Sequence, residues 1–253
     1  MKKVAMVTGA GEGIGMGICR VLAREGYDLM IHTATNLAPA EKLRDELIAS
    51  YGIRAYVVKA DFLHPGAFQE MFREFDAKFD RLDLFCNNAG ITEGAPFLEM
   101  SEETFERVVN INLKGSFFCT QEAAKRMIRM GIEGSIVLLS SNLREYIQPH
   151  MSVYGPVKSA IAQLAKNEAM ELAPYGIRVN AIAPGWVDSS PRLEPHRESS
   201  KRNIPLGKWA TVEQVGELVL YLASQKGDFF TGSVLTMDGG ASCQRDPDYQ
   251  FDV

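Results

Sequence analysis

Tyr154 and Lys158 stand four residues apart, so an α-helix would place the phenol and the ammonium on one face, one turn from each other. A free phenol has a pKa near 10, and holding it ionised at neutral pH costs roughly 4 kcal/mol, at about 1.4 kcal/mol per pKa unit. A fixed cation beside the phenol offsets part of that cost. The pair therefore has the chemistry of a general acid/base for an alcohol or a ketone. Because the same spacing also occurs by chance on the exposed faces of helices, a second signal is needed.

The glycine-rich run over residues 8–15 is that second signal, because it follows an apolar strand-like segment and opens a helical pattern. It has the form T-G-x-x-x-G-x-G; the strict G-x-G-x-x-G fingerprint would require a glycine at Met16. Glycines in this position permit a tight turn and let the backbone approach a pyrophosphate at a helix N-terminus. An ordinary glycine-rich turn is the alternative. We expect a dinucleotide to bind here through Gly9, Gly11, Glu12, Gly13, Ile14 and Gly15.

Short β-rich runs alternate with longer helical patterns along the rest of the chain, which is typical of a parallel sheet buried on both faces. We therefore predict a single-domain, Rossmann-type, doubly wound α/β fold with helices on both faces of the sheet. The pattern predicts a capping box from Thr211, and Pro174 with Gly176 as the end of the helix that carries Tyr154. About seven strands are expected, over residues 4–7, 28–32, 55–59, 82–86, 136–139, 178–183 and 234–237.

Composition limits the classes of molecule that the protein is expected to bind. A net charge of −5 argues against a nucleic acid or an anionic membrane surface, since both select for basic stripes. The four cysteines lie far apart and have no zinc-like spacing with the histidines, so we predict no metal and a reduced, cytoplasmic protein. No apolar run is long enough for a membrane span. We expect one domain over residues 1–253, with an irregular substrate lid at 184–210 and a tail at 241–253.

Further motifs occur in a fixed order along the chain. They are Asp61 after the third strand, N-N-A-G at 87–90, Asn112, Ser141 thirteen residues before Tyr154, Pro184-Gly185, and D-G-G at 238–240. Together with the glycine loop and the Tyr154/Lys158 pair, they make the chain resemble the short-chain dehydrogenase/reductase family from Val4 to about Ala241. Ser140 is the alternative to Ser141.

The resemblance implies a mechanism for these side chains. Tyr154 would act as the general acid in carbonyl reduction and as the base in alcohol oxidation. Lys158 would hold the nicotinamide ribose and lower the pKa of the phenol, and Ser141 would stabilise negative charge on the reacting oxygen. Asn112 would anchor a water that leads from Lys158 to solvent. The remaining cofactor contacts are expected from Thr33, Thr35, Asp61, Phe62, Asn88, Ala89, Gly90, Tyr154, Lys158, Pro184, Gly185, Val187 and Ser189.

The choice between NAD and NADP depends on the end of the second strand and on the glycine loop. Residues 32–36 contain neither the acid typical of NAD enzymes nor the basic residue typical of NADP enzymes. Glu12 stands where many NADP-dependent relatives carry arginine or lysine. A carboxylate about 4 to 6 Å from a phosphate costs a few kcal/mol at an effective dielectric constant near 20. We therefore expect NAD(H) in preference to NADP(H), with Glu12 as a solvated loop residue in the alternative case.

The substrate site should lie after Ser141, before Tyr154 and in the lid. Polar donors beside one indole favour a sugar, a sugar acid or a polyol, and so a small-molecule substrate whose secondary alcohol (or lactol) is interconverted with a ketone (or lactone). A 3-oxoacyl carrier-protein reductase, a hydroxysteroid dehydrogenase and a non-catalytic nucleotide sensor are the alternatives. The resemblance also implies a homotetramer or a homodimer. The substrate residues we expect are Asn142, Arg144, His150, Trp186 and Arg192.

Overall fold

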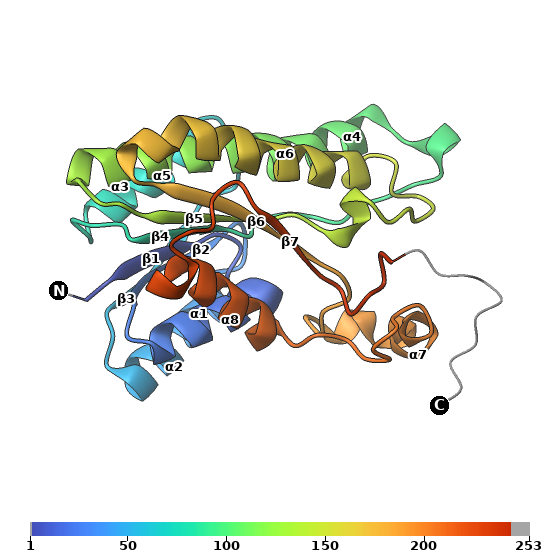
Figure 1. The fold of residues 1–253 in the computed structure, drawn as a ribbon, viewed down its shortest axis with the longest axis horizontal. Helices are drawn as coiled ribbons and strands as arrows, with labels where there is room; N and C mark the ends of the chain where they lie inside the picture. The colour runs from blue at the N-terminus through green and yellow to red at the C-terminus, as the bar shows by residue number, and fades with distance from the viewer. Residues whose placement is uncertain (1, 244–253) are drawn as a thin grey trace.

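The computed structural model describes residues 2–243, apart from the side chains of Pro191, Arg192 and His196. Seven parallel strands form one sheet, in the order β3-β2-β1-β4-β5-β6-β7 (Figure 1). The sheet order reverses between β1 and β4, and the crevice at the carboxyl ends of these two strands is where such sheets bind ligands. The strands are β1 (Val4–Val7), β2 (Asp28–Thr33), β3 (Ala55–Lys59), β4 (Leu84–Asn87), β5 (Ser135–Leu139), β6 (Arg178–Pro184) and β7 (Val234–Met237).

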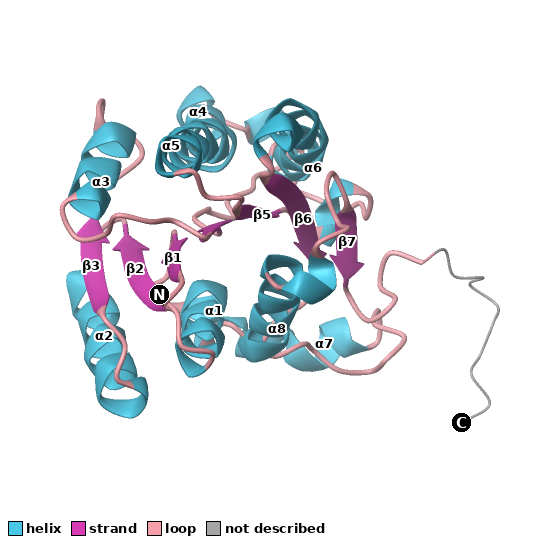
Figure 2. Cartoon of the chain, turned by 60° about the vertical axis from the view of Figure 1, so that its left-hand side comes forward, coloured by secondary structure: helices cyan, strands magenta, loops and turns pink. Residues whose placement is uncertain are grey.

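Helices cover both faces of the sheet, as Figure 2 shows. One layer packs on a core rich in phenylalanine, and it comprises α3 (Ala67–Asp76), α4 (Glu102–Val108), α5 (Gly115–Met130) and α6 (Tyr154–Leu172). The other layer packs on an aliphatic core, and it comprises α1 (Gly13–Arg24), α2 (Leu37–Tyr51) and α8 (Val212–Ala223). The predicted doubly wound α/β fold is therefore confirmed.

Helices α1 and α8 approach each other unusually closely because each contributes a glycine to the contact. A Cβ atom at Gly17 would lie 2.5 Å from Cβ of Val212, and one at Gly216 would lie 2.8 Å from Cγ2 of Val21. Any larger residue at either position would push the two helices apart. This contact fixes α1, and with it the glycine loop that precedes it, against the helix that follows the predicted lid.

The predicted element boundaries agree closely with the structure. The capping box is present: the Thr211 hydroxyl accepts from the Gln214 backbone N–H (3.2 Å), and the Gln214 side chain accepts from the Thr211 N–H (2.9 Å). Helix α6 ends at Leu172, and a 3₁₀ turn, η4 (Ala173–Tyr175), leads to Gly176 in the left-handed region at φ 70°. None of the described helices is long and apolar enough to cross a membrane.

The segment at 184–210 departs from the expectation, since it is not irregular throughout. It contains a 3₁₀ helix, η5 (Pro191–His196), and the short helix α7 (Arg197–Lys201). The indole of Trp209 is buried, stacks on Trp186 at 5.1 Å and donates to the Ser200 hydroxyl at 2.8 Å. The sequence did not predict these two short helices, because the lid is ordered by the packing of two tryptophans and not by a helical hydrophobic period. The predicted tail from residue 244 onward lies outside the described residues.

Candidate active site

Tyr154 and Lys158 begin α6 and share one of its faces, as the spacing predicted. The Lys158 Nζ atom lies 5.5 Å from the centroid of the Tyr154 ring, so the ammonium stands beside the phenol. Lys158 is only 4% exposed, and its Nζ donates to the Leu139 carbonyl at 2.8 Å. The fold thus places a cation and a phenol next to each other at the start of α6.

Two serines follow β5, and the structure separates their roles. The Ser140 hydroxyl donates to the Lys158 carbonyl at 2.7 Å, so it ties the strand to the first turns of α6. The Ser141 hydroxyl accepts from the Leu143 N–H at 3.2 Å, which leaves its own proton free to be donated elsewhere. Of the two, Ser141 is thus the one able to donate to a reacting oxygen.

Asn112 lies in a π-helical segment, η2 (Val109–Lys114), between α4 and α5. Its Nδ2 donates to the Val108 carbonyl (2.9 Å) and the Ile91 carbonyl (3.1 Å). Its Oδ1 is buried and has no hydrogen-bond partner within the described part of the chain. A Cβ atom at Gly90 would collide with this Oδ1 and lie 3.6 Å from the Lys158 Nζ, so both atoms border the same small space. An ordered water in that space would satisfy Oδ1 and contact Lys158.

The glycine loop is held by the motif at the end of β4. The Thr8 hydroxyl accepts from the Asn88 and Ala89 N–H groups, each at 3.0 Å. The Asn88 side chain donates to the Thr8 and Gly9 carbonyls, each at 2.9 Å. These bonds join the β1 and β4 ends at the point where the sheet order reverses. Sequence reasoning did not include Thr8 among the site residues.

Three glycines of the loop stand where a side chain would either collide with neighbouring atoms or strain the backbone. Gly9 and Gly13 lie in the left-handed region, at φ 63° and 60°. A Cβ atom at Gly15 would lie 2.5 Å from the Gly9 carbonyl oxygen and 2.7 Å from Nδ2 of Asn88. Glu12 is the N-cap residue of α1, but its exposed side chain forms no capping hydrogen bond. The first-turn N–H groups of α1 are therefore not capped by that side chain and suit an anion.

The ends of β2 and β3 form the side of the crevice expected for the adenosine. The Thr33 hydroxyl donates to the Asn36 carbonyl at 3.1 Å, and a Cβ atom at Gly11 would lie 3.1 Å from it. Thr35 is exposed. Asp61 accepts from the Leu63 N–H at 3.0 Å in a local turn.

Phe62 is buried beside that turn and stacks on the ring of His32, with ring centroids 4.8 Å apart. His32 was not among the predicted site residues, because a lone histidine in an apolar strand gives no recognisable motif.

The segment after β6 brings the lid onto the glycine loop. A Cβ atom at Gly185 would lie 2.6 Å from Cβ of Asp238, so the Pro184-Gly185 turn packs on the D-G-G turn. Val187 is buried and pairs with Ala210. The Ser189 carbonyl oxygen lies 3.4 Å from the position of a Cβ atom at Gly13. The structure thus brings Ser189, after β6, next to Gly13 of the glycine loop.

The predicted substrate residues are more dispersed. Asn142 is buried and its amide donates to Asp238 at 3.4 Å. Trp186 lies against Trp209, as described above. The Arg192 side chain lies outside the described part of the structure.

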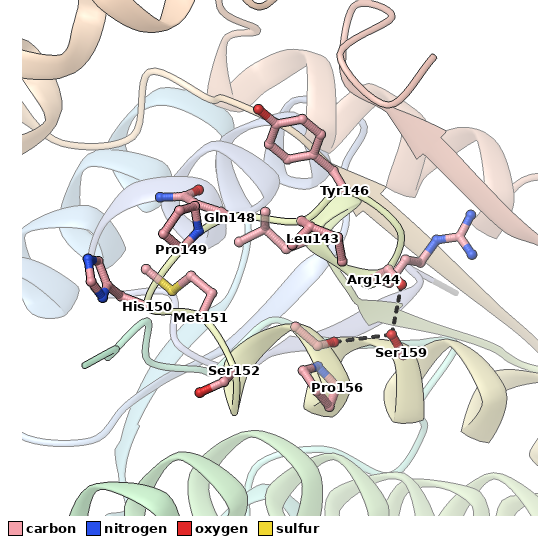
Figure 3. Close-up of a pocket in the computed structure, with 12 residues that line it drawn as sticks. Leu143, Arg144, Tyr146, Gln148, Pro149, His150, Met151, Ser152, Pro156 and Ser159 are labelled. Carbon is pink, nitrogen blue, oxygen red and sulfur yellow. Dashed lines mark hydrogen bonds between the residues drawn. The ribbon is translucent and has the colours of Figure 1, made fainter. Parts of the chain in front are cut away.

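Arg144 and His150 border a hollow of about 380 Å³ beside the loop that precedes α6 (Figure 3). The Arg144 guanidinium is bound to the Thr236 hydroxyl (3.1 Å) and to the carboxylate of Glu145 (2.6 Å). His150 is exposed and has a left-handed backbone at φ 68°, and its carbonyl accepts from the Ala95 N–H at 3.1 Å. Helix geometry places Pro156, which also lines the hollow, on a different face of α6 from Tyr154. The hollow therefore lies beside the reactive face and is distinct from it.

Comparisons with known proteins extend these observations over almost the whole chain. A family model described as Enoyl-(Acyl carrier protein) reductase matches residues 9–242. The 3-oxoacyl-(acyl-carrier-protein) reductase FabG of Staphylococcus aureus is 35% identical over 243 residues, which cover 95% of this chain and 98% of that protein. The chain belongs to the short-chain dehydrogenase/reductase family. The resemblance seen in the sequence motifs is thereby confirmed.

Solved structures of short-chain dehydrogenases/reductases have the same fold. The crystal structure of acetoin dehydrogenase from Enterobacter cloacae aligns with a TM-score of 0.91 and 32% identity, covering 99% of both chains. A short-chain dehydrogenase/reductase from Serratia marcescens aligns with a TM-score of 0.89 and 30% identity, covering 95% of this chain and 98% of that one. As a member of this family, the protein is an oxidoreductase that acts on CH–OH or keto groups and binds NAD(P)(H).

The residues in the crevice fit a nicotinamide dinucleotide. A Cβ atom at Gly15 would collide with the Gly9 carbonyl, and one at Gly9 would collide with Ala89, so glycine lets the loop fold tightly onto the β4 end. The unpartnered Oδ1 of Asn112 next to Lys158 fits a site completed by a polar partner. The donor set is rich in backbone N–H groups and in hydroxyl and amide side chains, as an anionic cofactor requires.

Proposed function

We propose that this protein interconverts a secondary alcohol and a ketone, or a lactol and a lactone, on a small polar substrate, with Tyr154 as the general acid/base. One observation carries the proposal: the buried Lys158 ammonium stands beside the Tyr154 ring and borders the same space as the unpartnered Oδ1 of Asn112. That arrangement supplies a phenol that can exchange a proton, a cation beside it, and a route by which the proton reaches water.

Each side chain then has a defined task in the reaction. A bound NAD(P)(H) supplies or accepts the hydride. During reduction, the Tyr154 hydroxyl gives its proton to the substrate oxygen, and during oxidation the phenolate takes it back. Ser141 donates a hydrogen bond to the same oxygen, which stabilises developing negative charge by about 3 to 4 kcal/mol in a preorganised site. Lys158 places a positive charge beside the phenol, and Asn112 holds the water through which the proton is replaced.

We further propose that the protein uses NAD(H) in preference to NADP(H). Glu12 is exposed on the glycine loop, where a 2′-phosphate would meet a carboxylate of the same charge. Thr33, at the end of β2, offers a hydroxyl group and has no positive charge that would attract the 2′-phosphate. Comparison of the Michaelis constants for the two cofactors tests the preference, and a lower constant for NADP would contradict it. The Glu12→Arg variant should then shift the ratio towards NADP.

A small, polar substrate agrees with the walls of the crevice. Asn142 presents a buried amide directly after Ser141. Trp186 is packed on Trp209, so its indole provides a fixed wall on the lid side. The likeness to acetoin dehydrogenase, whose name denotes a small hydroxyketone, supports substrates of this size. We therefore propose sugars, sugar acids, polyols or short hydroxyketones as the substrate class.

A 3-oxoacyl carrier-protein reductase is the second candidate, and the identity to the Staphylococcus aureus enzyme favours it. Docking of an acidic carrier protein requires a basic surface. The segment before and within α4 instead exposes Glu99, Glu102 and Glu103, and the chain has a net charge of −5. We therefore favour the small-substrate proposal.

Absorbance near 340 nm separates the candidates when it is followed across polyols, sugars, hydroxyketones and an acetoacetyl thioester, with each cofactor. Turnover of the thioester alone would select the carrier-protein reductase. Cofactor binding without turnover of any substrate would select a nucleotide sensor.

The Tyr154→Phe variant tests the general acid/base directly. The change removes the exchangeable proton and leaves the ring beside Lys158, so turnover should fall by about 10²-fold or more. The dissociation constant for the cofactor should change little. Tyr175→Phe, at the opposite end of α6, is the matched control and should keep full activity. Near wild-type turnover in Tyr154→Phe would exclude the proposed role.

A further inference from the structure

His32 is a buried, hydrogen-bonded histidine that the proposed mechanism does not use. It lies near the end of β2 and is 1% exposed. Its Nδ1 lies 3.1 Å from the Gly9 backbone N–H, and its Nε2 lies 2.7 Å from the Ala60 carbonyl. A backbone N–H can only donate and a carbonyl can only accept, so one neutral tautomer satisfies both contacts. That tautomer carries its proton on Nε2.

The two contacts join segments that are far apart in sequence. Gly9 is the first glycine of the loop and has a left-handed backbone, so its N–H direction is set by an unusual conformation. Ala60 follows β3 directly and precedes Asp61 and Phe62, the residues expected beside the adenine. The His32 ring also stacks on Phe62, with an interplanar angle of 6°. One imidazole thus spans the gap between the glycine loop and the β3 end.

The charge state of the ring agrees with this geometry. Burial lowers the pKa of His32 to about 4, although the bond to the Ala60 carbonyl and the charge of Asp61 act in the opposite direction. The ring is therefore neutral near pH 7, and Nδ1 keeps the lone pair that the Gly9 N–H requires. A second proton would place two N–H groups against each other.

We propose that His32 is a positioning residue for the adenosine half of the cofactor, because it fixes the glycine loop at Gly9 and the β3 end at Phe62 in one relative position. The inference deepens the proposed function, because it rests on cofactor binding in this crevice. It assigns His32 no contact with the reacting atoms. Loss of its bond to Gly9 should therefore weaken cofactor binding and leave the chemical step intact.

Three substitutions separate the two hydrogen bonds. In His32→Asn, the amide oxygen can take the place of Nδ1 and accept from Gly9. In His32→Gln, the longer amide can take the place of Nε2 and donate to Ala60, while His32→Leu retains neither bond. Met30→Ala, at a buried position in the same strand, is the control for loss of packing alone, which costs about 2 to 5 kcal/mol at such sites.

The test measures the dissociation constant for NAD(H) and NADP(H) by calorimetry, the melting temperature, and kcat at saturating cofactor. Leaving the buried Gly9 N–H unsatisfied should raise the dissociation constant about tenfold in His32→Gln and His32→Leu. His32→Asn should stay within about threefold of wild type. All variants should keep kcat within about twofold, since none touches the reacting groups. Met30→Ala should melt earlier and bind the cofactor normally.

Other outcomes would overturn the inference. If Met30→Ala weakens binding as much as His32→Leu at an equal loss of melting temperature, His32 is a packing residue only. Equal cofactor affinity in His32→Asn and His32→Gln would show that the hydrogen bond to Gly9 does not determine cofactor binding. The comparison of these two variants tests the inference even if His32→Leu does not fold. Wild-type protein that binds neither dinucleotide would refute the proposed function itself. Normal wild-type binding that no His32 variant weakens would refute the positioning role alone.

Discussion

Glu168 on α6 should make the folded protein less stable as the pH rises. Its Oε2 is enclosed and has no hydrogen-bond partner within residues 2–243. Burial, reinforced by the charge of Glu171, raises the pKa of the Glu168 carboxyl from 4.5 to about 8. Between these two values the unfolded chain releases the proton and the folded chain keeps it. The free energy of unfolding therefore falls by about 1.4 kcal/mol per pH unit over that interval.

The size of the effect follows from the interval. The full span from pH 4.5 to about 8 gives an upper limit of about 5 kcal/mol. Because the surrounding side chains relax and water can approach the ionised carboxylate, we expect a loss of about 2 to 4 kcal/mol by pH 8. The Glu168→Gln variant cannot ionise and has nearly the same shape as the protonated acid. It should match wild type near pH 4.5 and exceed it by that amount at pH 8.

Urea unfolding at half-unit steps from pH 5 to pH 8.5 measures the effect, at one protein concentration because assembly shifts apparent stability. Glu103→Gln, at an exposed position on α4 that does not act on Glu168, is the control and should keep the wild-type slope. Parallel curves for wild type and Glu168→Gln would refute the reasoning. A steeper fall in the Gln variant would do so as well, since that group has no proton to lose.

Four further variants test the site. Ser141→Ala should lower kcat by about 10² at an unchanged melting temperature, whereas Ser140→Ala should keep kcat and lose about 1 kcal/mol of stability with its bond to the Lys158 carbonyl; the reverse pattern would show that the two serines are assigned wrongly. Asn112→Ala removes the unpartnered acceptor and two hydrogen bonds to backbone carbonyls. Its kcat should fall, and its solvent isotope effect on kcat should rise because proton transfer becomes slower. An isotope effect equal to that of wild type would contradict the water route. Gly15→Ala should abolish calorimetric cofactor binding, because its Cβ would lie 2.5 Å from the Gly9 carbonyl oxygen, and retained binding would show that the cradle is not where the pyrophosphate lies.

Sequence reasoning predicted the sheet well because strands buried on both faces are continuous apolar runs with glycine or proline at their ends. All seven predicted strand positions are strands in the structure, with shifts of one or two residues at the ends. The Thr211 capping box and the Gly176 stop were equally readable, since both depend on local hydrogen bonding and backbone angles. Local signals of this kind can be recognised in the sequence without knowledge of the tertiary contacts.

What the sequence could not give depends on contacts between distant segments. The Trp186–Trp209 stack orders the lid, but neither tryptophan lies in a periodic pattern. Arg144 was expected to face a substrate, whereas the structure directs its guanidinium to Thr236 on β7 and to Glu145. His32 bridges two chain segments by binding their backbone atoms, and such contacts cannot be recognised from the residue types at those positions.

The reversal of strand order between β1 and β4 also has a consequence for synthesis of the protein on the ribosome. β1 is completed early, yet one of its edges waits for β4, where Ala5 pairs with Leu84. Until then the nascent sheet exposes an apolar, unpaired edge that can pair with another chain. The half of the sheet that contains the glycine loop is contiguous in sequence, as is the half that contains Tyr154, and within the sheet they are joined by the pairing of β1 with β4. A pause in translation before residue 84 would therefore leave the edge of β1 open, and a pause between β4 and β5 would leave the edge of β4 open instead.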